Sequence, residues 1–509
     1  MRHGLRQNLR NVWRNEHGYV LALVMLALMA MAMMSAVLVT QISISQQHVA
    51  RDRAYTQSLT VAEAGLNQYL WMVASGSSAD MNNFKIPGDP TPNDHHHVYE
   101  LTDPYNGELL GRYAMQVTPP SAGDSRVTVR VTGLANSPTE VPRTIEAHLG
   151  RPAFSEYILL VDEQVYIGGP ADRVWHGKTH SNTGIRIETA NIIDSINCAR
   201  STYEYTSGNT KPGIWSQDLP SNSPSKTYWH FPVPPIDFDI VTSDFARLSS
   251  LAPGEANLPY VGGSGFLGWY IKLLPNKRYQ VARVTAETEN RSTWNPATND
   301  YGGTLSIESL SAARNYPPNG VIYVNDDVWI EGTGLHGRLT VASSGQLNPS
   351  GAPRNATTIS VVGDITYAAK DGSAAIGLIA QNDVKIPMYA PWRKSCTAST
   401  REQLTLEIDA ALISQKGKEY VSYDSTGNAY SWGPRRGTLT FFGSVSSYAT
   451  PYRRTDTRAD GHYAGFFYGV NTYDHFLLHN PPPHFPKVGT YQILDWTELP
   501  SSSEAVPLE

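Results

Sequence analysis

Residues 19–39 read YVLALVMLALMAMAMMSAVLV, a run without a charged side chain in which Ser35 is the one clearly polar residue. At about 1.5 Å per residue such a run forms a helix of about 30 Å, the thickness of the hydrocarbon core of a bilayer. Four arginines lie in the first fourteen residues, and positive charge before a membrane helix favours a cytoplasmic N-terminus. The sequence therefore predicts a single-pass membrane protein whose bulk, after Thr40, is extracytoplasmic.

The helical pattern continues beyond the apolar run. Apolar positions recur at helical spacing through Trp71, although the turns around Gln46 and Asp52 are polar. We expect one transmembrane and assembly helix over residues 19–74, the second half of which protrudes from the membrane.

Two motifs in this region resemble known pilus proteins. Residues 14–23, RNEHGYVLAL, are similar to a prepilin-type leader, which implies a leader over residues 1–18 and cleavage between Gly18 and Tyr19. Residues 60–67, TVAEAGLN, resemble the Ala-Glu-Ala-Gly signature of the PilX family of pilus assembly proteins, here Ala62, Glu63, Ala64 and Gly65. The resemblance implies a minor pilin or pseudopilin-like subunit of a type IV pilus or a related secretion system.

The leader region departs from the family pattern at two positions. His17 stands where Lys or Arg is commoner, and Leu23 is the fifth mature residue, where major pilins place a glutamate. That glutamate is thought to pair with the N-terminal amine of a neighbouring subunit, so its absence favours a subunit that primes or caps the filament. The alternative is an ordinary signal anchor over residues 19–39.

The resemblance also implies partners. They are other pilin-like subunits, the inner-membrane assembly platform, the prepilin peptidase and the membrane itself. Small side chains along the apolar run would allow close helix packing in a filament core. Nucleic acid is not an expected partner, because the net charge of the chain is −6 and its Lys and Arg form no block beyond residue 14.

Composition predicts a mainly β fold for the rest of the chain. Charged residues are 17% of the 509 residues and aromatics 10%, with 41 Gly and 34 Pro, a mixture typical of β structure with many turns. Residues 75–105 are rich in Gly and Pro and predict a linker. Alternating apolar residues then predict strands up to residue 149, so residues 75–152 are assigned to a linker and a small pilin-like strand region.

Residues 153–509 show short apolar strands between turns. The strands beginning at Ile322, Leu339, Ile359 and Leu378 lie 17 to 20 positions apart, the spacing of coils in a solenoid. We expect a parallel, right-handed β-helix-like domain with an insertion at about residues 199–300, and an antiparallel β-sandwich is the alternative. Three motifs, at residues 180–182 (HSN), 480–483 (NPPP) and 495–498 (DWTE), resemble a β-helical domain of unassigned function found in some PilX-type proteins.

No metal site is predicted. Residues 95–97 are three histidines in a Gly/Pro-rich loop, and His176 and His180 lie in a β pattern, so neither group has the spacing of metal ligands. The calcium-loop-like residues 456–467 lack the third and twelfth ligands. Cys198 and Cys396 fit either one long-range extracytoplasmic disulfide or two buried thiols.

No catalytic motif and no cofactor motif is present, so the sequence predicts a non-catalytic protein. Two other functions stay open. A surface adhesin or carbohydrate-binding protein would use the aromatic side chains to contact a glycan or a surface ligand, and a polysaccharide-active β-helix enzyme would add paired carboxylates. The tryptophans that could contact sugars are Trp215, Trp229, Trp269, Trp294, Trp392 and Trp432.

Overall fold

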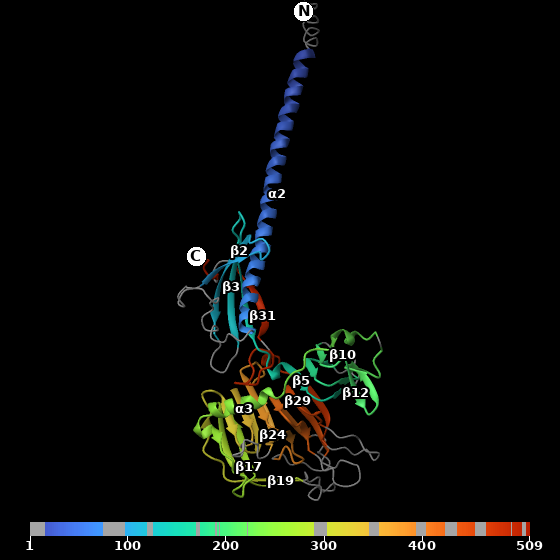
Figure 1. The fold of residues 1–509 in the computed structure, drawn as a ribbon, viewed down its shortest axis with the longest axis vertical. Helices are drawn as coiled ribbons and strands as arrows, with labels where there is room; N and C mark the ends of the chain where they lie inside the picture. The colour runs from blue at the N-terminus through green and yellow to red at the C-terminus, as the bar shows by residue number, and fades with distance from the viewer. Residues whose placement is uncertain are drawn as a thin grey trace, which may run out of the picture. The chain divides into compact units, whose positions relative to one another are not determined.

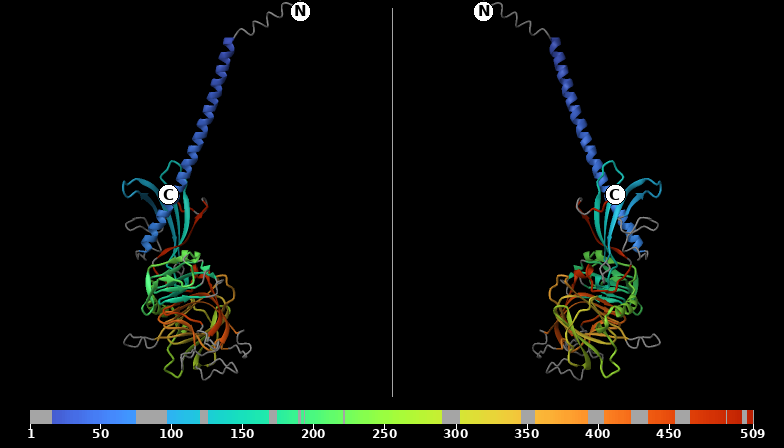
Figure 2. Two further views of the ribbon diagram at one scale, coloured as in Figure 1. Left: turned by 90° about the vertical axis from the view of Figure 1, so that its right-hand side faces the viewer. Right: turned by 90° about the vertical axis from the view of Figure 1, so that its left-hand side faces the viewer.

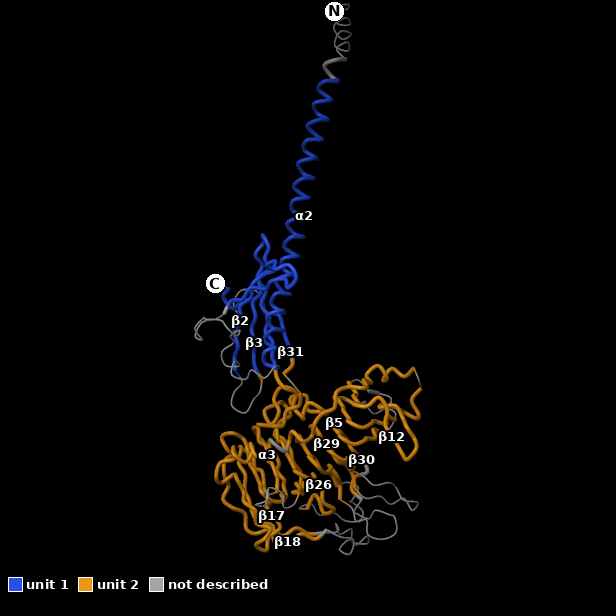
Figure 3. Tube along the Cα trace, viewed as in Figure 1, with its two compact units in different colours: residues 1–119, 127–149, 493–509 blue, residues 120–126, 150–492 orange. Residues whose placement is uncertain are grey.

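The chain folds into two compact units (Figure 3). Unit 1 comprises residues 1–119, 127–149 and 493–509, and unit 2 comprises residues 120–126 and 150–492. Strands outnumber helices in both units, and a long N-terminal helix precedes them, which confirms the predicted mainly β fold. The computed structural model describes residues 16–74, 97–119, 126–168, 174–188, 191–192, 194–220, 222–289, 303–345, 356–392, 404–422, 435–453, 465–489, 491–500 and 505–508.

The described residues of unit 1 form one helix and one sheet. Helix α2 (Glu16–Ala74) is continuous for 59 residues, and Figures 1 and 2 show its C-terminal part lying along the sheet. The sheet has five strands in the order β1-β2-β3-β4-β31, and β1 to β4 pair antiparallel. The strands are β1 (His97–Thr102), β2 (Leu109–Thr118), β3 (Val127–Ala135), β4 (Arg143–Gly150) and β31 (Gln492–Leu499).

The helix docks through one face because its apolar residues recur every three or four positions from Ala54 onward. The buried positions of α2 are Ala54, Ser58, Val61, Ala62, Gly65, Leu66, Tyr69, Met72 and Val73. The sheet meets them with alternating residues of β2, β3 and β4, which are inward on every second position. The core of unit 1 is therefore the interface between one helix and one sheet face.

The last strand of the chain belongs to unit 1. β31 takes the edge position beside β4 in the five-stranded sheet, although residues 153–509 were all assigned to the β-helical domain by sequence. Unit 2 is thus inserted in the chain between two neighbouring strands of the small sheet. Local sequence could not show this, since the pairing joins segments more than 300 residues apart.

Unit 2 contains two columns of parallel strands. In the first column each strand pairs in parallel with the next, as expected for a β-helix and unlike an antiparallel sandwich. The order is β16 (Asn257–Leu258), β21 (Val321–Val324), β23 (Gly337–Ser343), β25 (Ala374–Ala380), β27 (Thr405–Ser414), β29 (Arg435–Ser447), β5 (Tyr157–Val161), β8 (Lys178–Ser181), β11 (Ile196–Cys198) and β15 (Trp229–His230).

The order of coils in space differs from their order in the chain. The N-terminal strand β5 stacks on the C-terminal strand β29, where Val445 pairs with Leu159, so the stack is continuous although the sequence is not. We call this junction the seam. Strand β30 (Gly465–Tyr473) pairs with the first half of β29 at the same level.

The second column is also parallel and is divided at the seam. On one side lie β17 (Gly268–Leu274), β22 (Val328–Leu335), β24 (Ile359–Tyr367), β26 (Val384–Ile386) and β28 (Glu419–Val421). On the other lie β6 (Val165–Ile167), β9 (Ile185–Ile187) and β14 (Ile214–Trp215).

The predicted strand at Ile359 was placed in the wrong column. The even spacing suggested that it follows Leu339 in one stack, but Ile359 pairs with Val328 and Val384 in the second column, while Leu339 pairs with Ile376 in the first. Strands of both columns are short and apolar, so spacing alone does not distinguish them.

A core runs between the columns, and a second apolar layer covers the outside of the first column. Helix α3 (Ile240–Leu251) supplies Val241, Phe245 and Leu248 to this outer layer, where they pack with Phe485 and the alternate residues of β21, β25 and β27. The first column is therefore buried on both faces, which explains its nearly continuous apolar strands.

Residues 199–300, the predicted insertion, contribute to the stack and to its edges. They hold β14, β15, β16 and β17 of the columns together with α3. They also form antiparallel pairs, namely β12 (Thr202–Thr206) with β13 (Asn209–Pro212) and β17 with β18 (Arg278–Glu289), which continues to β19 (Gly303–Ile307). The remaining short strands are β7 (Val174–Trp175), β10 (Asn191–Ile192) and β20 (Arg314–Asn315).

Candidate functional site

The first half of α2 is exposed and apolar. Residues from Val20 to Ala74 form the helix that is long and apolar enough to cross a membrane, and none of its most apolar window is buried in the protein. Leu23 is 70% exposed, and Gly18 and Tyr19 lie near the start of the helix, which begins at Glu16. Such an apolar surface needs lipid or other helices to cover it.

The second half of α2 docks on the sheet through close contacts. A Cβ on Gly65 would lie 2.6 Å from the ring of Tyr113 in β2, and a Cβ on Gly133 would lie 2.4 Å from the carbonyl of Ser58. Burial raises the pKa of Tyr113 to about 12, so its hydroxyl stays protonated and donates to Gln68 Oε1. The absence of side chains at two glycines thus permits the helix to approach the sheet.

The Ala-Glu-Ala-Gly residues have different surroundings. Ala62 and Gly65 are buried against the sheet, and Glu63 and Ala64 are half-buried on the flank of the helix. The motif therefore combines docking positions with a carboxylate at the edge of the interface.

Ser58 is a docking residue of α2 that was not predicted from the sequence. It is fully buried, and its Oγ accepts a 3.0 Å hydrogen bond from the backbone N–H of Ala135. A serine in a helical pattern carries no signal that it faces a sheet. The alanine, valine and leucine positions beside it supply that signal.

The DWTE motif fastens the C-terminal strand to unit 1. Arg143 of β4 is 4% exposed, forms an ion pair with Glu498 and lies over the ring of Tyr55, 3.3 Å from its centroid. His148 Nδ1 of β4 forms a hydrogen bond with Asp495 Oδ1 of β31. Val506 is buried, and its N–H donates to Thr132 Oγ1 at 2.8 Å. The motif therefore belongs to the five-stranded sheet of unit 1 and not to unit 2.

The HSN motif connects two segments of unit 2 by hydrogen bonds. The Asn182 side chain donates to the carbonyl of Ile236 at 2.7 Å and accepts from its N–H at 2.9 Å, which ties the segment before α3 to a coil. His180 is buried, and burial lowers the pKa of its imidazole. His180 contacts Asn182 Oδ1 at 2.8 Å, so the ring holds the asparagine in place.

The NPPP motif lies across the first column. Arg338 Nε donates to the carbonyl of Pro481 at 3.1 Å, and Thr340 Oγ1 donates to the carbonyl of Pro483 at 2.5 Å. Gly377 leaves room for Phe485, whose ring would lie 2.8 Å from a Cβ there. The prolines cannot join a strand ladder, so they cover the column from outside.

Several buried or half-buried carboxylates in unit 2 accept hydrogen bonds from neighbouring side chains. Glu331 accepts from Tyr270 Oη at 2.5 Å and from Trp392 Nε1 at 3.0 Å, and Glu287 accepts from Trp329 Nε1 at 3.0 Å. Burial raises the pKa of Glu419, which pairs with Arg453 at 3.0 Å. These contacts satisfy the carboxylates within the fold.

Several residues named in the metal and disulfide predictions lie outside the described ranges. Among the residues that the structure describes, no group of three His, Cys, Asp or Glu side chains could hold a metal ion. Residues 95–96 and 456–460 lie outside the described ranges. Cys198 is buried, and burial raises the pKa of its thiol. Cys396 lies outside the described residues, so the pairing of Cys198 with Cys396 stays a prediction.

Comparisons with known proteins identify no family for this chain. No family model matches the chain, and no curated protein sequence matches it. Among solved structures, the chain is similar to the crystal structure of the competence-associated pilin ComZ from Thermus thermophilus, with 13% identity, 88% of this chain and 97% of that chain covered, and a TM-score of 0.28. At that TM-score the similarity supports no inference about this chain.

Proposed function

We propose that this chain is a membrane-anchored, pilin-like subunit that carries a large β-rich domain outside the cytoplasm and has no catalytic role. The observation that supports it most is the division of α2 into an exposed apolar half and a half packed on a five-stranded sheet. The first half would reside in the inner membrane and then pack against the apolar helices of other subunits. The sheet and unit 2 would remain outside the helical core.

The sequence at the start of α2 supports processing by a prepilin peptidase. Gly18 directly precedes the apolar run, so cleavage after it would leave Tyr19 as the first residue and the helix intact. Leu23 supports a priming or capping position, because a leucine cannot pair with the terminal amine of a subunit ahead of it.

Processing is tested by intact-mass and N-terminal analysis of the chain recovered from membranes of cells with and without prepilin peptidase. We expect a chain starting at Tyr19 only when the peptidase is present. The variant Gly18→Leu should remain uncut, and Gly4→Ala should be cut normally. A chain starting at Met1 in both strains would reject the pilin-like class.

The position in a filament needs a separate measurement. Immunogold labelling of unit 2 on purified filaments should mark one end if the subunit primes or caps the filament. Labelling along the whole length would reject that position while leaving the pilin-like class in place.

A further inference from the structure

The outer face of the second column carries a row of aromatic and cationic side chains. In the three-residue strands β28, β6 and β9 the first and third residues are buried. The middle residue points away from the core, because successive side chains point to opposite faces. The middle residues are Tyr420, Tyr166 and Arg186. Trp215 of β14 pairs in register with Arg186 and extends the row.

One half of the row is a stacked cluster. Arg186 Cζ lies 5.2 Å from the ring centroids of both Tyr166 and Trp215, and Tyr166 is 58% exposed. The guanidinium is fixed in plane by Glu188 at 2.6 Å and by Tyr205 Oη at 2.8 Å. These groups come from three successive coils.

The other half of the row repeats this chemistry across the seam. The rings of Tyr420 and Tyr452 lie 5.5 Å apart, and Lys418 Nζ lies 4.9 Å from the centroid of Tyr452. At the far end, Lys211 Nζ lies 4.9 Å from the centroid of Trp215. A lysine therefore lies near each end of the row.

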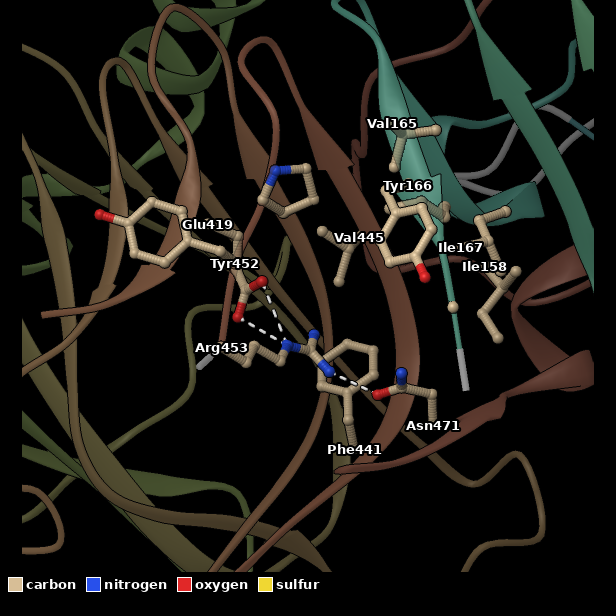
Figure 4. Close-up of a pocket in the computed structure, with 13 residues that line it drawn as sticks. Ile158, Val165, Tyr166, Ile167, Glu419, Phe441, Val445, Tyr452, Arg453 and Asn471 are labelled. Carbon is tan, nitrogen blue, oxygen red and sulfur yellow. Dashed lines mark hydrogen bonds and ion pairs between the residues drawn. The ribbon is translucent and has the colours of Figure 1, made fainter. Parts of the chain in front are cut away.

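A cavity of about 180 Å³ lies at the seam, between the two halves. Figure 4 shows Tyr452 and Tyr166 on opposite sides of it, with Arg453 between Glu419 and Asn471. The halves are joined by the bond from Thr450 Oγ1 to the carbonyl of Gln164, 2.6 Å long. Whole small-molecule sites measure roughly 300–1,000 Å³, so this cavity suits one ring of a longer ligand.

The chemistry of the row indicates the ligand. Aromatic faces pack against the apolar faces of sugar rings, and neighbouring strands lie about 4.8 Å apart, comparable to the length of one sugar unit along a chain. Arg453 and Asn471 are half-buried at the cavity, and their side chains offer donors and an acceptor to hydroxyl groups.

The charged side chains of the row indicate which class of polymer it binds. Arg186 and Arg453 have carboxylate partners, and Lys211 and Lys418 place a cationic group beside an aromatic ring near each end of the row. We propose that this row binds a linear acidic polysaccharide, with sugar rings on Tyr166, Trp215 and Tyr452 and carboxylates or sulfates near the lysines. This site does not depend on the pilin-like role, since it lies wholly in unit 2.

Calorimetric titration of the full-length protein in detergent with a defined oligogalacturonate tests the site. We expect saturable binding that weakens with salt. Trp215→Ala and Tyr452→Ala should each weaken it about tenfold or more, equivalent to about 1.4 kcal/mol. Lys418→Gln should reduce both affinity and salt dependence. Trp496→Ala is the matched control, because this tryptophan is 49% exposed in unit 1, and it should bind as the wild type does.

Four results would overturn the site. They are no binding of the oligogalacturonate, wild-type affinity in all three row variants, equal affinity for a neutral cello-oligosaccharide, and tighter binding of single-stranded oligothymidylate. Thermal melts identify any variant that fails to fold. In that case the affinity of Lys418→Gln, at a half-buried surface position, tests the site.

Discussion

Gly65 of α2 lies directly against the aromatic ring of Tyr113, so close that a Cβ on residue 65 would be 2.6 Å from Cδ2 of the tyrosine. Real Cβ atoms do not approach a ring carbon so closely, so either the helix or the strand would have to move. The signature that first suggested a pilus protein thus ends on the residue that lets the helix dock.

Gly65→Ala should destabilise unit 1 by about 1–3 kcal/mol through overpacking. In an open helical position the same change would stabilise by roughly 1 kcal/mol, because alanine has the higher helix propensity. Denaturant unfolding followed by circular dichroism measures the change in free energy. In a Tyr113→Ala background Gly65→Ala should cost much less, and a Gly65→Ala effect that is the same in both backgrounds would contradict the contact.

Glu498→Gln should loosen the C-terminal strand. The change leaves the guanidinium of Arg143, 4% exposed, without its carboxylate, and we expect a loss of roughly 1–2 kcal/mol because Glu498 itself is 36% exposed. Amide hydrogen exchange should become faster in β31 and β4. Glu146→Gln is the control, because its partner Arg130 is itself 36% exposed and can be hydrated; a larger effect there would contradict the assignment.

Unit 1 should fold without unit 2. Since β4 and β31 are neighbours in one sheet, a short Gly/Ser linker between Gly150 and Gln492 should replace the whole of unit 2. Dispersed amide signals in the NMR spectrum of the shortened chain in detergent micelles would show the fold. A second deletion that also removes residues 492–509 should lose it, and a folded product without β31 would contradict the role of that strand.

Unit 2 should lose stability as the pH rises from about 4 to about 6. Burial raises the pKa of Asp474 to about 6, with Asp409 contributing and with Lys370 and His475 opposing. The ordinary value is about 4, so in this window the folded state holds more protons than the unfolded chain, and stability falls with pH and is level above it. The carboxyl of Asp327, whose pKa is also raised to about 6, acts in the same direction.

Asp474→Asn should remove part of this fall. An amide oxygen can still accept the hydrogen bond from the N–H of Phe476, so the variant should gain roughly 1–2 kcal/mol relative to wild type between pH 4 and pH 7. Thermal melts across this range give the difference. The comparison with wild type also cancels His180, whose lowered pKa acts in the opposite direction. Asp371→Asn should show no such trend, because the hydrogen bonds from Ser373 lower the pKa of that exposed carboxyl.

The sequence by itself determined the parts that depend on local pattern. An uncharged run long enough for a bilayer can be identified without a structure, and so can the helical period through Trp71 and the short apolar strands of unit 2. The buried face of α2 from Ala54 to Val73 follows from that period, because apolar side chains at helical spacing must meet one surface.

Only the tertiary structure decided which distant segments meet. The pairing of β31 with the small sheet, the stacking of β5 on β29 and the placement of Ile359 in the second column join residues that are far apart in the chain. Short apolar strands fit several neighbours equally well, so their partners are chosen by the packing of the whole domain. The row from Tyr420 to Trp215 exists for the same reason, since it is assembled across the seam.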